Sequence, residues 1–374
     1  MKRRRVLLFA PAAVAVVLLA GCAGPTPVSS APPTATTTVA PAPTPTASEV
    51  AGPPQVRVPF DCDALYTEAT ATPLVGVTLT ARGGRNAALT SLYGVAERQA
   101  GMLDCGWDGG VATDFGPANG LGIVVVPDEA TGYDNNVAAA QPAKYHPVTG
   151  TAGDKSSYYC TSRGLDAQGY SCVGEMVVGK YWVLIDLVHT VPVAPAVAAG
   201  AMQKALERTA ATVDSAGPEL PAWIPPTGAP SSFCTDAQST TRVRAAIGDS
   251  TATLYKDTNG PVYTAANVGY SASYSDCFWT GKHSASTNFT LVPGGAWAFP
   301  GIRPAISVDS TLYGAKFSAW TVPGAGSALV ACKGSCEAFL TVGQTAAQID
   351  VEDAGKAATT AKLAKLAAAI KAAG

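Results

Sequence analysis

The cysteines are the residues whose type and spacing point most clearly to chemistry. The chain has nine of them, and eight lie after residue 60: Cys62, Cys105, Cys160, Cys172, Cys234, Cys277, Cys332 and Cys336. In each successive group of four, the first two are 43 residues apart and the second and third are 55 residues apart. Equal intervals in two successive groups indicate a tandem repeat.

The repeat extends beyond the cysteines. An offset of 172 residues also matches tryptophan, aspartate and glycine positions, pairing Trp107 with Trp279, Asp104 with Asp276 and Gly76 with Gly248. After the third cysteine the offset falls to 164, because CTSRGLDAQGYSC in the first copy is replaced by CKGSC in the second. The smaller offset still matches Gly179 with Gly343.

The eight cysteines are expected to form disulfides, because an even number in an exported chain favours oxidation. Many pairings are open to eight cysteines, but duplication favours one pattern used twice. The predicted pairs are Cys62 with Cys105, Cys160 with Cys172, Cys234 with Cys277, and Cys332 with Cys336. Zinc ligation is the alternative, although CxxC pairs are absent from the sequence.

Two short motifs suggest ester hydrolysis. Gly248-Asp249-Ser250 resembles the nucleophile block of SGNH-type esterases, and the run from Asp186 to His189 resembles the DxxH that supplies their base. In that family the serine block comes first, whereas here the order is reversed and the motifs lie in different copies. We therefore expect turn and strand residues and no catalytic site.

Other catalytic and binding classes find little support. His146 and His283 have no partner at metal-ligand spacing, and HExxH, GxSxG, GxGxxG and P-loop motifs are absent. We predict no metal and no cofactor. Acidic residues are scattered, so no glycosidase-type carboxylate pair can be chosen. With 25 basic and 27 acidic residues, nucleic-acid binding is disfavoured.

Aromatic residues give the sharper indication of binding. Five flank the predicted Cys160–Cys172 hairpin and are candidate ligand contacts: Tyr158, Tyr159, Tyr170, Tyr181 and Trp182. The second copy has Val330, Ala331, Thr345 and Ala346 at matching places. Aromatic rings suit the faces of sugars or lipids, but the same alternating residues could simply fill the core of a sheet.

The pattern around these residues predicts an α+β fold. CDALYTEAT opens a short helix, and NAALTSLYGVAERQA places Leu89, Leu92, Tyr93 and Ala96 at helical spacing. The apolar runs GLGIVVVPDE, SSYYC, CVGEMVVGK and YWVLIDLVHT predict strands. Each copy closes with a helix, at residues 194–213 and in AATTAKLAKLAAAIKAA. We expect two tandem repeats, each a mainly antiparallel sheet with packed helices and two disulfides. The last helix could instead lie on anionic lipid.

The N-terminus predicts export and lipid attachment. A basic start at residues 2–5 precedes fifteen residues without charge, which suits a secretory signal peptide. Leu19-Ala20-Gly21-Cys22 resembles the lipobox of bacterial lipoproteins. The resemblance implies that Cys22 receives a diacylglyceryl group, that the preceding peptide is removed, and that an acyl chain such as palmitate is added at the new amino terminus. An accidental cysteine after an ordinary signal peptide is the alternative, and the arginines leave the Sec or Tat route open.

These features set the expected organisation. They predict a signal peptide over 1–21, a disordered Ala/Pro/Thr-rich tether over 22–58, a first α+β domain over 59–214, a Pro-rich linker over 215–231 and a second α+β domain over 232–374. The Ala, Pro and Thr bias and the cysteine and tryptophan pattern loosely resemble small α+β domains of actinobacterial lipoproteins of unknown function.

The expected function follows from this organisation. We expect a lipid-anchored protein on the outer face of the cytoplasmic membrane. Binding of an envelope partner or small ligand is favoured over enzymatic activity. The alternatives are an envelope hydrolase acting on cell-wall or lipid material and a structural or assembly-assisting lipoprotein.

Overall fold

The computed structural model describes residues 53–82, 89, 91–109, 119–139, 147–163, 169–189, 193–224, 233–234, 237–255, 275–281, 286–302, 316–333, 335–352 and 356–373. Structural statements below refer to these residues. The expected signal peptide, Cys22, His146 and His283 lie outside them.

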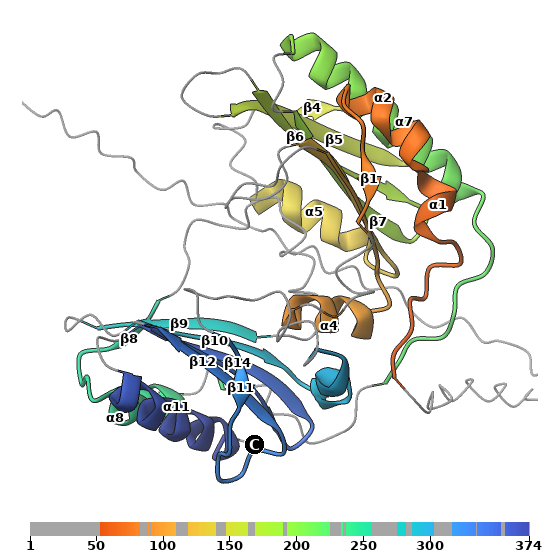
Figure 1. The fold of residues 1–374 in the computed structure, drawn as a ribbon. Helices are drawn as coiled ribbons and strands as arrows, with labels where there is room; N and C mark the ends of the chain where they lie inside the picture. The colour runs from red at the N-terminus through yellow and green to blue at the C-terminus, as the bar shows by residue number, and fades with distance from the viewer. Residues whose placement is uncertain are drawn as a thin grey trace, which may run out of the picture. The chain divides into compact units, whose positions relative to one another are not determined.

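The first sheet has seven strands, all paired antiparallel. They are β1 (Thr80–Ala81), β2 (Leu103–Gly109), β3 (Asn119–Val126), β4 (Val148–Thr149), β5 (Lys155–Arg163), β6 (Gly169–Val178) and β7 (Tyr181–His189), in the order β1-β2-β3-β7-β6-β5-β4. Figure 1 labels β1, β4, β5, β6 and β7 of this sheet. The β6–β7 hairpin turns at Gly179, whose φ of 57° favours glycine.

The second sheet also has seven antiparallel strands. They are β8 (Thr253–Tyr255), β9 (Ser275–Thr280), β10 (Ser286–Val292), β11 (Ser318–Ala319), β12 (Ala328–Lys333), β13 (Ser335–Val342) and β14 (Thr345–Glu352). From the β8 edge the order is β8-β9-β10-β14-β13-β12-β11, which is the first sheet's order strand for strand. The turn glycine Gly343 also has a φ of 57°.

Helices cover one face of each sheet. In the first half these are α1 (Cys62–Leu65), α2 (Glu68–Val75) and α7 (Pro195–Asp214), and in the second half α8 (Ala237–Ile247) and α11 (Lys356–Lys371). Asp61 caps α1 by accepting a hydrogen bond from the Ala64 amide, and Pro195 starts α7 in a position where its missing N–H is not needed. Further helices are α4 (Leu92–Gln99), α5 (Ala130–Ala139) and the 3₁₀ helix η2 (Gly295–Ala298).

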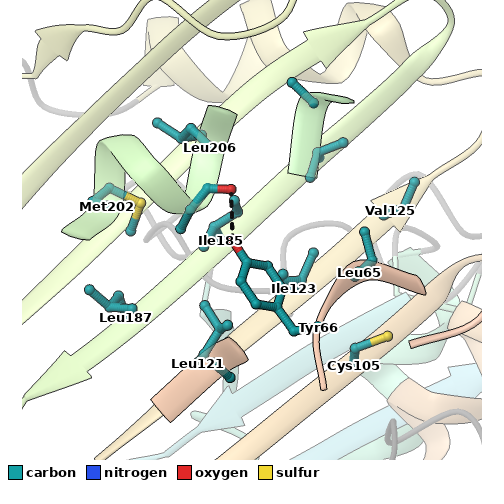
Figure 2. Close-up of a cluster of buried hydrophobic side chains, with 14 of the residues drawn as sticks. Leu65, Tyr66, Cys105, Leu121, Ile123, Val125, Ile185, Leu187, Met202 and Leu206 are labelled. Atoms are coloured by element: carbon teal, nitrogen blue, oxygen red, sulfur yellow. Dashed lines mark hydrogen bonds between the residues drawn. The ribbon is translucent and has the colours of Figure 1, made fainter. Parts of the chain in front are cut away.

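Each helix-covered face has an aromatic centre. Tyr66 packs edge-on against Trp107 with ring centroids 5.8 Å apart, and its hydroxyl donates to the Ala205 carbonyl at 3.4 Å (Figure 2). In the second half Phe233 packs on Trp279 in the same way, also at 5.8 Å. Fully buried aromatic residues of this size dominate core energetics.

A third buried cluster contains residues of both sheets. Helix α4 contributes Leu92 and Val95 to it, the first sheet contributes Trp182, and the second sheet contributes Phe339 and Val292. Tyr93 of α4 also donates a hydrogen bond to Asp276 at 3.4 Å. Helix α4 is therefore buried on several sides, which a single helical stripe in the sequence does not reveal.

The fold class is α+β with two antiparallel sheets and four disulfides. The disulfides join Cys62 to Cys105, Cys160 to Cys172, Cys234 to Cys277, and Cys332 to Cys336, which are the pairs that the spacing predicts. The sequence did not predict α5. Leu89 has a φ of 48° and precedes α4 instead of belonging to it.

Residues on both sides of the first α+β domain contact it. Pro54 and Val58 are buried, although the sequence places them in the tether. After α7, Leu220 is bonded to the start of the first half, because its amide donates to the Arg57 carbonyl at 3.1 Å. Helix α11 buries Leu363, Leu366 and Ile370 in the second core. In the described part of the chain, no helix has both the length and the apolar character needed to cross a membrane.

Candidate functional site

A row of polar side chains crosses the second sheet on the face opposite α11. Glu337 on β13 pairs with Asp350 on β14, which pairs with Asn288 on β10. Their neighbours Cys336, Ala338, Phe289 and Ile349 belong to the core on the α11 face. Because successive strand residues point to opposite faces, all three polar side chains lie on the other face.

Gln348 joins the two carboxyl groups. Its amide nitrogen donates to Glu337 Oε1 at 2.7 Å and to Asp350 Oδ2 at 3.4 Å. Glu337 is only 6% exposed. Burial, and then the negative charge of Asp350, raises the pKa of Glu337 to about 8. At neutral pH this is therefore a protonated acid beside a second carboxyl group, an arrangement able to donate and accept protons or to bind a polar ligand.

A second carboxyl group lies on the same face in the neighbouring row, where Thr290 pairs with Gln348 on β14 and with Asp276 on β9. Asp276 accepts hydrogen bonds from the Tyr93 hydroxyl and from the Thr290 hydroxyl, each at 3.4 Å. Burial raises the pKa of Asp276, and these hydrogen bonds oppose that shift. Helix α4 of the first half thus supplies one donor to the polar face of the second sheet.

The matching row of the first sheet has different side chains. Across the face opposite α7, Tyr159, Val173, Asp186, Gly122 and Gly106 follow one another on adjacent strands. A side chain at Gly106 would meet the Arg82 guanidinium at 2.7 Å, so glycine there makes room for Arg82. Arg82 in turn pairs with Asp108 at 3.0 Å. Only the second sheet has two carboxyl groups side by side in this row.

The five aromatic candidates do not lie on one surface. Tyr158, Tyr170 and Tyr181 pack on the α7 face, whereas Tyr159 and Trp182 lie on the opposite face. Tyr159, Tyr181 and Trp182 are buried, and the Trp182 indole donates to Glu175 at 3.2 Å. Tyr158 and Tyr170 are half-buried and flank the Cys160–Cys172 disulfide. Those two alone keep appreciable exposed surface.

The esterase-like motifs serve structural roles. Asp186 and His189 are three residues apart on β7 and so point to opposite faces of the sheet. His189 is buried against the Val75 carbonyl, with 3.2 Å to its Nδ1 atom, and burial lowers its pKa. Gly248 ends α8 in the left-handed region, and Asp249 accepts from the amide and hydroxyl of Thr251.

The sequence did not predict the row of carboxyl groups on the second sheet. The alternation of Gln348 and Asp350 with the apolar Ala347, Ile349 and Val351 was the available signal, since residues two apart on a strand share one face. Their pairing with Glu337 depends on strand register, which the sequence does not give.

Comparison with known proteins adds no relative: no family model, no curated protein and no solved structure matches the chain. Among the residues that the structure describes, no group of three or more histidine, cysteine, aspartate or glutamate side chains is arranged to hold a metal ion.

Proposed function

We propose that this chain is an exported, lipid-anchored protein of the cell envelope that binds a partner or small ligand and is not a catalyst. The observation that carries the proposal is the closure of all eight cysteines after residue 60 into disulfides. Disulfides persist in oxidising compartments outside the cytoplasm. The ninth cysteine, Cys22, follows the signal-like start and is left for a different role.

Cys22 is the proposed attachment point. Leu19-Ala20-Gly21-Cys22 has the small residues that signal cleavage needs next to the thiol that takes the lipid. Two or three acyl chains hold a protein firmly, at about 0.8 kcal/mol for each buried methylene. A proline-rich tether then carries the folded body away from the outer face of the cytoplasmic membrane.

The two halves are proposed to be duplicates of one domain. The shared strand order supports this. Each half also has a disulfide between direct cross-strand partners at the same place in its sheet, Cys160 with Cys172 and Cys332 with Cys336. Coincidence of strand order, disulfide placement and turn glycines in unrelated domains is improbable.

The first half is the proposed binding half. Tyr158 and Tyr170 keep exposed surface beside a disulfide-clipped hairpin, which would hold their rings in place. In the second half Val330 stands at the position of Tyr158. Tyr159, Tyr181 and Trp182 support the sheet from within. The partner class is an envelope protein or a small ligand with a flat apolar face, such as a sugar or lipid.

Two experiments test the proposal. Growth of the native host with an alkyne-tagged palmitate should label the wild-type protein and leave Cys22→Ser unlabelled.

For binding, a soluble N-acetylglucosamine oligomer and phosphatidylglycerol vesicles serve as sugar and lipid probes. The double variant Tyr158→Ala with Tyr170→Ala should lose binding, whereas Val330→Ala, the matched control in the second half, should retain it. Failure of both probes with wild type would favour an assembly-assisting lipoprotein.

A second candidate function is hydrolysis of cell-wall or lipid material. The Glu337 and Asp350 carboxyl groups favour it, because one is protonated near neutral pH beside a second acid. Activity against cell-wall preparations that Glu337→Gln abolishes without loss of folding would establish this function. Equal activity in Glu337→Gln would assign the pair a structural role.

A further inference from the structure

Arg57 joins three separate segments through its backbone and side chain. Its amide donates to the Gly101 carbonyl at 2.8 Å, and its carbonyl accepts from the Leu220 amide at 3.1 Å. Its Nε atom also donates to the Leu220 carbonyl at 3.1 Å. The segment that enters the first half is therefore bonded directly to the segment that leaves it.

Four charged side chains surround this junction. Arg57 forms ion pairs with Asp128 and Glu219, and Lys180 forms ion pairs with Glu219 and with Asp128, the last at 3.6 Å. The Glu219 side chain is 3% exposed and that of Arg57 is 13% exposed. A carboxylate this well buried is tolerated because it is paired, and removing its cations leaves an uncompensated charge.

The backbone around Arg57 leaves room for its side chain. Gly101 has a φ of 75°, and a side chain there would meet the aliphatic stem of Arg57 at 2.3 Å. Asp128 has a φ of 58°, in the left-handed region that residues other than glycine rarely adopt. This conformation lies in the turn after β3 and brings the carboxylate to Arg57 and Lys180.

Neighbouring groups favour the charged forms of Asp128 and Lys180. The hydrogen bond from Arg57 lowers the pKa of Asp128, and the hydrogen bond to Glu219 raises that of Lys180. Two other titratable groups act on the junction. Burial and the Asp128 charge raise the pKa of Glu129, and burial and the Glu219 charge raise that of Tyr181.

We propose that Arg57, Asp128, Lys180 and Glu219 form a charge clasp that holds residues 216–224 on the first half and releases them together with residues 53–58. The clasp couples the segment on the N-terminal side of the first half to the segment that leads to the second half. Displacing Arg57 removes both hydrogen bonds to Leu220 and one cation from Glu219 in a single step. The device does not depend on whether Cys22 carries lipid.

Hydrogen exchange of the Leu220 amide, measured by NMR on the full chain, tests the clasp. We expect protection in wild type and exchange faster by on the order of tenfold in Glu219→Gln, because a charge-assisted contact is lost locally. High salt should accelerate exchange in wild type less than Glu219→Gln does, since salt screens the half-exposed Lys180–Asp128 pair and acts weakly on the buried Arg57–Glu219 pair. The Ile123 and Ile185 amides, within the first sheet, should remain unchanged.

A second variant and a matched control distinguish local release of Leu220 from general unfolding. Asp128→Asn removes one charge while keeping a residue type that tolerates the left-handed conformation, so the turn should survive. It should also accelerate Leu220 exchange. Asp134→Asn breaks the exposed pair with Lys155, 2.6 Å apart in the native chain, and should change nothing at Leu220.

Three results would overturn the clasp. One is rapid Leu220 exchange in wild type at low salt. Another is unaltered exchange in both Glu219→Gln and Asp128→Asn. The third is acceleration of Ile123 and Ile185 by the same factor as Leu220, because this would mean that the first half opens as a whole and has no separate clasp.

Discussion

Glu337 and Asp350 are direct partners across β13 and β14, and the Gln348 amide donates to both of their carboxyl groups. This relationship contributes a pH response to the second half. The folded chain holds the Glu337 proton up to a pKa of about 8, compared with an ordinary value of 4.5. The stabilisation from this group is complete below the ordinary value and is lost as pH rises through about 8.

Glu337→Gln should remove that response. The neutral amide has nearly the same shape and still offers an oxygen to Gln348. We expect the free energy of unfolding of wild type to fall, relative to that of the variant, as pH rises from 5 to 8, so that the variant is the more stable protein at pH 8. Urea titrations across this range measure both. Parallel curves for the two proteins would contradict a buried, protonated Glu337.

His189 should give the opposite response in the first half. Burial lowers its pKa below the ordinary 6.5, so the unfolded chain takes up a proton more readily. The stabilisation from neutral His189 is present above that value and is lost as pH falls below it. His189→Asn keeps a donor for the Val75 carbonyl and should flatten the acid side of the stability curve. Glu337→Gln serves as the control, since it should keep the loss of stabilisation that comes from His189 as pH falls below 6.5.

The sequence predicted the elements that depend on local pattern or repeated spacing. The paired intervals gave the disulfides, and the apolar runs gave strands β3, β5, β6 and β7. It did not predict contacts between distant segments. Arg57 and Glu219 lie in the segments expected to be a tether and a linker. No pattern in the sequence near either residue indicates that the two segments are in contact. The burial of Leu92 and Val95 against two sheets likewise depends on tertiary packing.

The disulfides should differ in strength with the loop that each one closes. Cys234 and Cys277 close a separation of 43 residues, whereas Cys332 and Cys336 close one of 4. Loop-entropy reasoning gives about 4 kcal/mol for the first and about 2 kcal/mol for the second. Paired Cys→Ser variants compared by urea unfolding measure the difference. Equal losses would show that loop entropy does not govern these bridges.

Gly101→Ala should destabilise the first half through two effects. The left-handed backbone disfavours alanine by roughly 1–2 kcal/mol, and the new methyl group collides with the Arg57 stem. Gly248→Ala is the matched control, because Gly248 has a φ of 74° and no atom within 4 Å of an added side chain. We expect Gly101→Ala to lose more free energy of unfolding than the control. A smaller loss would show that Arg57 moves aside easily.

Intact mass spectrometry of the protein purified from its native host tests the central claim most directly. The account predicts a chain that begins at Cys22 and carries a diacylglyceryl group on its sulfur. Fragments digested without reduction should contain the four bridges. A chain that retains residues 1–21, with an unmodified thiol at Cys22, would contradict export by this route and the lipid anchor with it.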